Sequence, residues 1–274
     1  MIDVSIVIPV YNEAENIIET LTNIENKLLF AHEILIVYDM DNDNTLPVVK
    51  SFPPQERCQI RLLKNKYRSG ALNAVKTGFE EADGEMIIVT MADLSDAPET
   101  INEMVQKAKD EQADIVCGSR YMKGGRQIGG GFVKSTLSRC AGYSLRYLAG
   151  VPTHDATNSF KLYKKSFLSQ QTIESSGGFE LGLELVIKAF LQGYKIAEVP
   201  TVWRDRKNGR SHFQLVNGIL KHLPNSRRKL LPFYNCCCKW QNLRCVNNVL
   251  QPDERKREQF QSNRASFSWS SRRQ

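Results

Sequence analysis

Five aspartates fall in two short segments, each directly after a run of apolar residues. Asp39, Asp41 and Asp43 follow one run, and Asp93 and Asp96 follow another. Hard cations such as Mg²⁺ and Mn²⁺ bind one or two carboxylates and otherwise the phosphates of a substrate. A cation held in this way would neutralise a leaving diphosphate. Either segment alone could equally be an Asp-rich turn that caps the next helix, whereas two such segments on one edge of a sheet favour a metal site.

Two common phosphate-binding motifs are missing from the sequence. The loop after the first apolar run reads PVYNEAEN, which lacks the glycines of a dinucleotide-binding site. The P-loop pattern GxxxxGK[ST] does not occur either. A dehydrogenase and a P-loop phosphotransferase are therefore disfavoured.

Later in the chain, two further patterns allow a functional and a structural interpretation. The segment GGRQIGGG at 124–131 could close over a substrate as a lid, or it could be a plain flexible connection. Glu180 and Glu184 lie four residues apart and so share one face of an expected helix. One of them could orient a sugar or an acceptor, but an ion pair between Glu184 and Lys188 explains the spacing equally well.

The apolar runs that would position these residues alternate with helical patterns. They are VSIVIPV (4–10), EILIVY (33–38), IRLL (60–63), MIIVTM (86–91) and DIVCGS (114–119). Runs of this kind suit strands that are covered on both faces, and β-α-β alternation predicts a doubly wound α/β domain with a mostly parallel sheet. The loops that follow four of these runs, after Val10, Tyr38, Met91 and Ser119, should then form one ligand site.

Two helical stripes support this organisation. The first, with Asn12 as its expected N-cap, carries Ala14, Ile17, Ile18, Leu21 and Leu28. The second follows Pro98 and carries Ile101, Met104, Val105 and Ala108.

Charge is distributed unevenly along the chain. Twelve of the 37 Lys and Arg, but 3 of the 30 Asp and Glu, lie from Lys221 onward. We expect a catalytic domain over residues 1–222 and a basic, irregular or disordered tail over 223–274. Such a tail is attracted to anionic membranes, or is simply solvated; nucleic-acid binding is not expected, because no supporting motif accompanies the charge.

The sequence shows neither a membrane-spanning run of about 18 apolar residues nor the pattern of a signal peptide. Three cysteines, Cys58, Cys117 and Cys140, are scattered through expected core elements, as reduced thiols are. We therefore expect a cytoplasmic protein.

Six segments in order give a resemblance to a known family. They are VSIVIPVYNEAENI, YDMDNDNT, MADLSDAPETI, CGSRYMKGG, DATNSFK and WRDRKNGRSHF. Together they resemble the motifs of family 2 glycosyltransferases, and most of all the dolichyl-phosphate mannosyltransferase branch, over roughly residues 3 to 215. The resemblance implies an A-type glycosyltransferase fold, a GDP- or UDP-hexose donor, Mg²⁺ or Mn²⁺, and a polyprenyl phosphate acceptor.

The resemblance also implies roles for individual residues. Tyr11 would lie against the donor base, unless it packs in the core, and Glu13 would reach a polar edge of the nucleotide. The metal ligand would be Asp93, aided by Ser95 or Asp96. The donor site as a whole would comprise Pro9, Tyr11, Glu13, Val37, Asp39, Ala92, Asp93 and His212.

For the acceptor phosphate, the resemblance implies Arg120, Lys134, Ser138 and Arg206. Guanidinium groups suit phosphate because their fork makes paired, charge-assisted hydrogen bonds. The acceptor phosphate is itself anionic and can attack the sugar without a separate base. Catalysis by Asp93, Arg120 and Arg206 would then be positioning and stabilisation of charge.

Three positions depart from the family pattern. Tyr38 replaces the first of two adjacent aspartates, and Met91 replaces the first aspartate of an Asp-Ala-Asp metal motif. Because a thioether is a poor ligand for Mg²⁺ or Mn²⁺, metal binding should be weakened. His212 replaces a lysine and would bind an anion less well at neutral pH.

We therefore predict an inverting hexosyltransferase, with mannose or glucose as the sugar, that acts peripherally on the cytosolic face of a membrane. The basic tail or a membrane-anchoring partner would hold it there. A soluble glycosyltransferase with a saccharide or protein acceptor is one alternative and would need Glu180 or Glu184 as a base. A non-catalytic nucleotide-sugar-binding subunit is the other, and it rests on Tyr38 and Met91.

Overall fold

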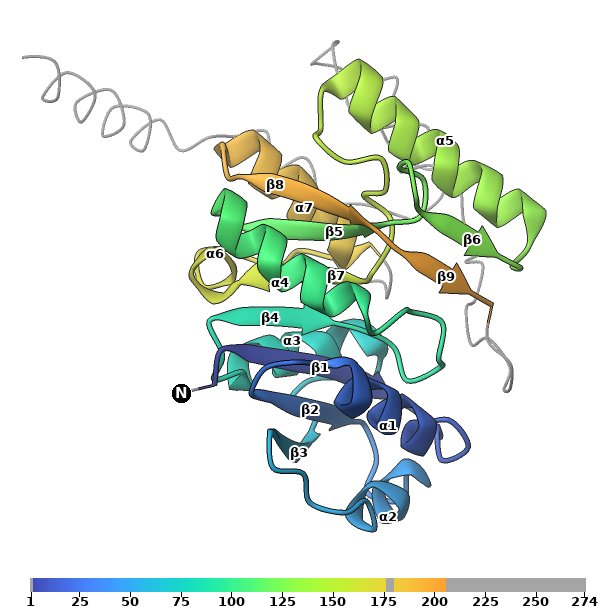
Figure 1. Ribbon diagram of the computed structural model, residues 1–274, viewed down its shortest axis with the longest axis vertical. Helices are drawn as coiled ribbons and strands as arrows, with labels where there is room; N and C mark the ends of the chain where they lie inside the picture. Colours follow the sequence, from blue (N-terminus) through green and yellow to red (C-terminus); the bar gives the residue numbers. More distant parts are fainter. Residues whose placement is uncertain (1, 176–179, 206–274) are drawn as a thin grey trace, which may run out of the picture. The chain divides into compact units, whose positions relative to one another are not determined.

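A seven-stranded sheet forms the centre of the computed structural model, which describes residues 2–175 and 180–205 (Figure 1). Its strands lie in the order β3-β2-β1-β4-β7-β5-β8. They are β1 (Val4–Val10), β2 (His32–Tyr38), β3 (Cys58–Lys64), β4 (Met86–Val89), β5 (Ile115–Ser119), β7 (Lys161–Lys164) and β8 (Ile196–Pro200). β7 runs antiparallel to both of its neighbours and the other pairs are parallel, which confirms the prediction of a mostly parallel sheet.

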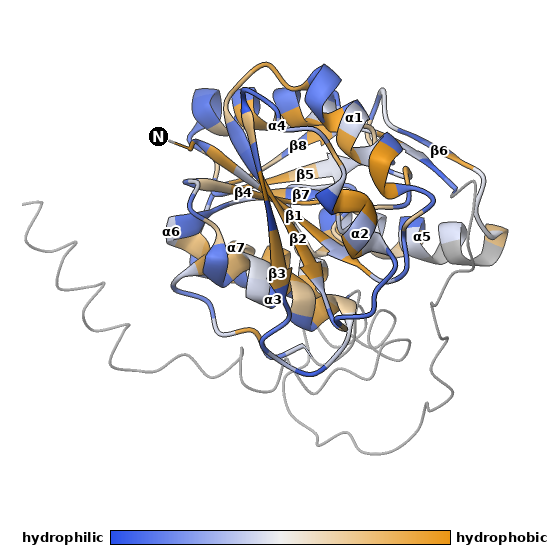
Figure 2. Cartoon of the chain, turned by 90° about the horizontal axis from the view of Figure 1, so that it is seen from below, coloured by the Kyte–Doolittle hydropathy of each residue, from blue (hydrophilic) through white to orange (hydrophobic). Residues whose placement is uncertain are grey.

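Helices cover both faces of this sheet and bury its apolar strands (Figure 2). One face packs against α1 (Ile17–Lys27), α2 (Thr45–Lys50) and α4 (Thr100–Glu111). The other packs against α3 (Ala71–Glu81), α6 (Lys165–Leu168) and α7 (Leu181–Gln192). β1, β2, β4 and β5 are rich in apolar residues because both of their faces are covered, whereas β3, at the edge of the sheet, is only partly buried.

The start of the first helix differs from the prediction. Asn12 is not its N-cap: it has a left-handed backbone with φ 56°. Its N–H donates to both carboxylate oxygens of Asp43, at 3.1 and 3.2 Å, and α1 begins after Asn16. Ile18 is exposed and Ile24 is buried in its place, whereas the predicted stripe of α4 is buried as expected.

A small second sheet lies beside α5 (Phe132–Ala149). It pairs β6 (Arg126–Ile128) with β9 (Val202–Arg204), in parallel. The N–H of Gly130 donates to the Asp205 carboxylate at 3.2 Å. The glycine-rich segment is therefore hydrogen-bonded to the end of the described chain, and whether it acts as a lid or as a flexible connection stays open.

Two predictions, the domain boundary and the lack of a membrane-spanning segment, extend beyond the residues that the structure describes. The boundary expected at residues 222 and 223 lies outside them and stays a prediction. Within residues 2–175 and 180–205, no helix has the length and apolar character needed to span a membrane.

One glycine sets how closely α5 approaches the rest of the domain. A Cβ atom at Gly142 would lie 2.0 Å from the carbonyl oxygen of His154. Tyr143 and Tyr147 flank this contact, each with its ring edge-on to the His154 ring. The segment that follows His154 is thereby held against the helix.

We predict that Gly142→Ala lowers the free energy of unfolding by about 1–3 kcal/mol, because the added methyl group meets backbone and the helix must move away. Urea unfolding followed by circular dichroism measures the change. Gly131→Ala is the matched control, since a Cβ there meets nothing within 4 Å. Equal stability of the two variants would contradict this packing.

Candidate functional site

The loops that follow β1, β2 and β4 are joined by hydrogen bonds at the carboxyl edge of the sheet. The N–H of Glu13 donates to Thr45 Oγ1 at 2.9 Å, which links the first loop to the second. Thr20 Oγ1 donates to the carbonyl of Ala92 at 3.0 Å, which links α1 to the loop after β4. Three of the four predicted loops thus meet at one edge, while ligand binding there stays a prediction.

The first aspartate group divides into three different environments. Asp43 is buried and accepts the N–H of Thr45 at 2.8 Å, so the helix-capping interpretation is correct for this residue. Asp41 is exposed and forms an ion pair with Lys64 at 2.5 Å. Both carboxylates therefore already have partners within the protein.

Asp39 instead orders the loop that leads into α3. Its carboxylate accepts hydrogen bonds from Asn65 Nδ2 at 2.7 Å and from the N–H of Gly70 at 2.8 Å. Gly70 has φ 134°, which favours glycine. Asn65 and Gly70 were not predicted as part of the site, and the polar run between β3 and α3 was the available signal for them.

The remaining residues expected around the donor base have contrasting exposure. Tyr11 is 45% exposed, so the core-packing interpretation is wrong. The Glu13 carboxylate accepts a hydrogen bond from Asn16 Nδ2 at 2.8 Å. Val37 is fully buried and Ala92 nearly so, which leaves their backbones as the parts able to meet a ligand.

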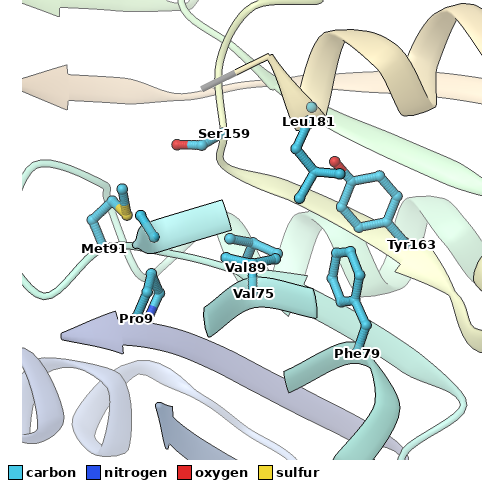
Figure 3. Close-up of a pocket in the computed structure, with 10 residues that line it drawn as sticks. Pro9, Val75, Phe79, Val89, Met91, Ser159, Tyr163 and Leu181 are labelled. Atoms are coloured by element: carbon cyan, nitrogen blue, oxygen red, sulfur yellow. The ribbon is translucent and has the colours of Figure 1, made fainter. Parts of the chain in front are cut away.

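Met91 lies at an apolar pocket of about 30 Å³ (Figure 3). Pro9 and Val89 of neighbouring strands line it, with Ser159 and Leu181 drawn across from Met91. Met91 also borders a larger cavity of about 260 Å³ that Ser95 and Asp96 help to line. The thioether thus stands where the apolar pocket and the acidic loop meet.

Asp93 and Asp96 are both buried in that loop. Asp93 Oδ1 accepts the N–H of Ser95 at 3.1 Å, and Asp96 Oδ2 accepts the hydroxyl of Thr90 at 3.0 Å. Burial, followed by the charge of Asp93, raises the pKa of Asp96 to about 7. A divalent cation near Asp93 would relieve this repulsion.

This donor set fits Mg²⁺ or Mn²⁺ in a minimal way. Within the described ranges, no three His, Cys, Asp or Glu ligand atoms converge at the carboxyl edge. Such cations nevertheless bind through one or two carboxylates when substrate phosphates and water complete the shell. Asp93, with Ser95 or Asp96 beside it, meets that requirement.

Arg120, at the end of β5, is held by Asp155. Nε of Arg120 donates to one Asp155 carboxylate oxygen at 2.7 Å, and Nη2 donates to the other at 2.9 Å. The Asp155 side chain is fully buried and that of Arg120 is 12% exposed. The paired hydrogen bonds fix the plane of the guanidinium. Burial lowers the pKa of Arg120, but the hydrogen bonds and the charge of Asp155, with smaller contributions from other groups, outweigh burial and raise it.

Two hydroxyls complete this cluster. Arg120 Nη2 lies 3.1 Å from Ser138 Oγ and 3.3 Å from Thr157 Oγ1, and the two hydroxyl oxygens are 2.5 Å apart. The structure thus brings together Arg120 and Ser138, two residues expected at the acceptor phosphate. Asp155 and Thr157 were not predicted as site residues, although the segment DATNSFK contains both.

Three other expected residues are not placed. Lys134 belongs to α5, but its side chain lies outside what the structure describes. Arg206 and His212 lie beyond the last described residue. Their roles stay predictions.

The Glu184 carboxylate is bound by several neighbouring groups of the protein. It forms an ion pair with Lys188 at 2.6 Å, which confirms the ion-pair interpretation of their spacing. Its carboxylate also accepts the N–H groups of Glu174 and Ser175 at 2.8 and 2.9 Å. These bonds lower the pKa of Glu184 and commit it to holding the segment before α7. Glu180 is buried at the N-cap of the same helix.

Comparison with known proteins gives the family and its relatives. The model of glycosyl transferase family 2 matches residues 5–171. A dolichol-phosphate mannosyltransferase of Pyrococcus furiosus is 30% identical over 213 residues, which cover 76% of this chain and 58% of that protein. A polyprenol monophosphomannose synthase of Mycolicibacterium smegmatis is 28% identical over 209 residues, 74% of this chain and 78% of that one. The chain thus spans little more than half of the Pyrococcus protein.

Solved structures show the same fold. Glucosyl-3-phosphoglycerate synthase of Mycobacterium tuberculosis, crystallised with Mn²⁺, UDP and glucosyl-3-phosphoglycerate, has a TM-score of 0.59 at 16% identity. The match covers 76% of this chain and 73% of that one. Residues 1–349 of S. aureus TarS, crystallised with UDP, match with a TM-score of 0.56 at 16% identity over 74% and 61% of the two chains. The predicted A-type glycosyltransferase fold is confirmed.

Removal of Asp155 should be costly, because it leaves a mostly buried guanidinium without its partner. We expect Asp155→Ala to lower the free energy of unfolding by about 3–5 kcal/mol. Asp41→Ala, which breaks the exposed pair with Lys64, should cost much less, because solvent screens that pair. Chemical denaturation of both variants makes the comparison, and similar small losses in the two would show that Asp155 does not hold Arg120.

Proposed function

Because this chain belongs to glycosyl transferase family 2, we propose that it is an inverting hexosyltransferase that moves a sugar from a nucleoside diphosphate to a polyprenyl phosphate. Mannose and glucose are the favoured sugars, and GDP or UDP the favoured carrier. The observation that carries the proposal is the oriented Arg120, with Ser138 beside it, at the same sheet edge as the buried pair Asp93 and Asp96. The relatives named above support a polyprenyl or dolichyl phosphate acceptor.

The nucleotide would bind at the loops that follow β1 and β2. Tyr11 offers an exposed aromatic face for the base, and Glu13 an acceptor for its polar edge. Asp39 would act through the loop that it orders, and Pro9 borders the pocket beside Met91. Val37 and Ala92 would contribute backbone atoms, and His212 would approach from the late motif.

Asp93 would hold the divalent cation, with Ser95 or Asp96 in support. When bound, Mg²⁺ or Mn²⁺ supplies positive charge that stabilises the departing nucleoside diphosphate. Met91 provides no oxygen at the position where a second carboxylate is expected, so the site depends more strongly on the phosphates of the donor.

At the acceptor side, Asp155 takes the Nε–Nη2 edge of Arg120 and fixes the direction of the rest of the guanidinium. The acceptor phosphate would meet the Nη1 side of Arg120 and the hydroxyl of Ser138, with Lys134 and Arg206 as further cations. A phosphate oxygen, already anionic at neutral pH, would attack the anomeric carbon as the bond to the diphosphate breaks, so that the configuration inverts. Most of the rate enhancement would then come from the positioning of the acceptor phosphate against the anomeric carbon.

The soluble alternative, with a saccharide or protein acceptor, requires a general base. Glu184 is engaged by Lys188 and two backbone N–H groups, which disfavours it for that role and leaves Glu180 as the candidate. The alternative of a non-catalytic subunit rests on Met91 and Tyr38.

A lipid acceptor places the protein peripherally at the cytosolic face of a membrane. The basic residues from Lys221 onward would be attracted to anionic lipid at about 1 kcal/mol per nearby charge, or a membrane-anchoring partner would supply the contact. Nucleic acid is not an expected partner.

We expect release of nucleoside diphosphate to depend on a polyprenyl phosphate, since the phosphate is both nucleophile and ligand of Arg120. UDP- and GDP-hexoses are assayed with and without a short polyprenyl phosphate, in Mn²⁺, Mg²⁺ or EDTA. Transfer to free saccharide without lipid would favour the soluble alternative. Binding of a nucleotide sugar without turnover in any condition would favour a non-catalytic subunit.

Met91 gives a sharper test of the cation site. We expect Met91→Asp to lower the Mn²⁺ concentration for half-maximal activity about tenfold or more, because a hard carboxylate replaces a thioether. Met91→Leu keeps the volume without adding a ligand and should leave that concentration unchanged. A titration of activity with Mn²⁺ measures both variants, and an unchanged midpoint in Met91→Asp would place the cation elsewhere.

A further inference from the structure

Three side chains with metal-ligating atoms meet at the amino edge of the sheet, opposite the loops of the proposed transferase site. Glu25 lies near the end of α1, His32 begins β2 and Cys58 begins β3. Their ligand atoms all lie within 4.8 Å of one another. Among residues 2–175 and 180–205, this is the one group of three His, Cys, Asp or Glu side chains with that property.

The fold brings these three residues together at fixed positions. β2 and β3 are parallel neighbours, and their register pairs His32 with Cys58. α1 ends at Lys27 with Leu28 as its C-cap, and a short connection leads to His32 at the start of β2, where the Glu25 carboxylate lies 3.0 Å from the His32 ring. The group thus joins one helix and two strands that belong to the same half of the sheet (Figure 1).

The hydrogen bonds of His32 leave one ring nitrogen facing the group. Its Nδ1 lies 2.9 Å from the carbonyl oxygen of Phe30, which can only accept, so Nδ1 carries a hydrogen. Metal-binding histidines commonly fix their tautomer through such a backbone carbonyl. In the neutral ring, Nε2 then presents its lone pair to the group.

That lone pair faces another acceptor. Nε2 lies 3.0 Å from Glu25 Oε1, and the His32 side chain is 1% exposed while that of Glu25 is 12% exposed. Two acceptors at this distance, with little water around them, need either a proton shared between them or a cation that both can bind. A second proton on His32 provides one solution and a metal ion provides another.

If a metal ion binds between His32 and Glu25, the sulfur of Cys58 determines which metals are suitable. Its thiol is half-buried and lies close to the Glu25 carboxylate. A free thiol carries a proton, and the thiolate is the form that binds a metal. A metal that binds here must displace this proton to solvent, which soft or borderline cations do and Mg²⁺ does not.

We propose that Glu25, His32 and Cys58 form a binding site for Zn²⁺ or a similar borderline transition-metal cation. The ligands would be one carboxylate oxygen, one imidazole nitrogen and one thiolate, and water would take a fourth position. Bond lengths of about 2.0–2.3 Å place neighbouring tetrahedral ligands about 3.3–3.8 Å apart, so the side chains need small movements. Neither the sequence spacing nor the transferase motifs indicate this site.

A cation at this site would be structural for the donor half of the domain. It would fasten the end of α1 to the starts of β2 and β3, whose other ends carry the loops around Tyr11 and Asp39. Since a ligand that binds the folded state alone stabilises it, Zn²⁺ should raise the melting temperature. The effect does not depend on transferase activity.

Metal binding is measured on the full chain after treatment with EDTA. Because four cysteines from Cys236 to Cys245 could also bind Zn²⁺, all variants carry serine at positions 236, 237, 238 and 245. In this background we expect one equivalent of Zn²⁺ to bind and to raise the melting temperature. Co²⁺ should show the thiolate-to-metal charge-transfer absorption that marks a sulfur ligand.

Two variants remove ligands, and one controls for the loss of a thiol. Cys58→Ser and Glu25→Gln should each weaken Zn²⁺ binding at least about tenfold, since even outer-shell losses have effects of that size. Cys140→Ser, which removes an exposed thiol, should leave binding unchanged. Circular dichroism in EDTA establishes that each variant is folded before its affinity is compared.

Either of two results would overturn the proposal. The first is absence of Zn²⁺ binding in the serine background, which would leave the protonated His32–Glu25 pair as the whole explanation. The second is binding of equal strength in the Cys58 and Glu25 variants. Both are distinguishable from failure of the proposed transferase function, which is assayed separately with donor and lipid phosphate.

Discussion

The ion pair between Arg120 and Asp155 is the constraint on which the candidate site depends. A guanidinium that is mostly removed from water keeps its charge at low cost only when a carboxylate pairs with it. Here the Asp155 carboxylate does so and accepts two parallel hydrogen bonds from Arg120. The pair connects the end of β5 to the segment before β7, and Arg120 reaches Ser138 of α5. Three elements that are distant in sequence are thus aligned around one oriented cation.

Much of the architecture could be predicted because it follows from patterns local in sequence. Strands covered on both faces read as continuous apolar runs, so β1 and the order of β-α-β units were evident. The direction of β7 was not, since the short sequence KLYK does not say whether the strand that it forms lies parallel or antiparallel to its neighbours. The start of α1 was misplaced because Asn12 binds Asp43, a partner 31 residues away.

The site could be predicted to the level of its loops and its main charged groups. The distinct roles of Asp39, Asp41 and Asp43 depend on tertiary hydrogen bonds that their identical side chains do not reveal. The sequence did not indicate that Asp155 is the partner of Arg120. It also did not indicate that His32 lies beside Cys58, because this depends on the register of β2 and β3. A single sequence therefore does not reveal the role of a residue when that role depends on a partner that is distant in the sequence.

The most direct test of the account is the affinity of a short-chain polyprenyl phosphate for wild type and for Arg120→Lys, with UDP and GDP binding measured alongside. Lysine keeps the charge opposite Asp155 but lacks the planar fork. We predict that lipid-phosphate affinity falls at least about tenfold in Arg120→Lys while nucleotide affinity is unchanged. Unchanged lipid-phosphate affinity, or an equal loss for both ligands, would contradict the assignment of Arg120 to the acceptor phosphate.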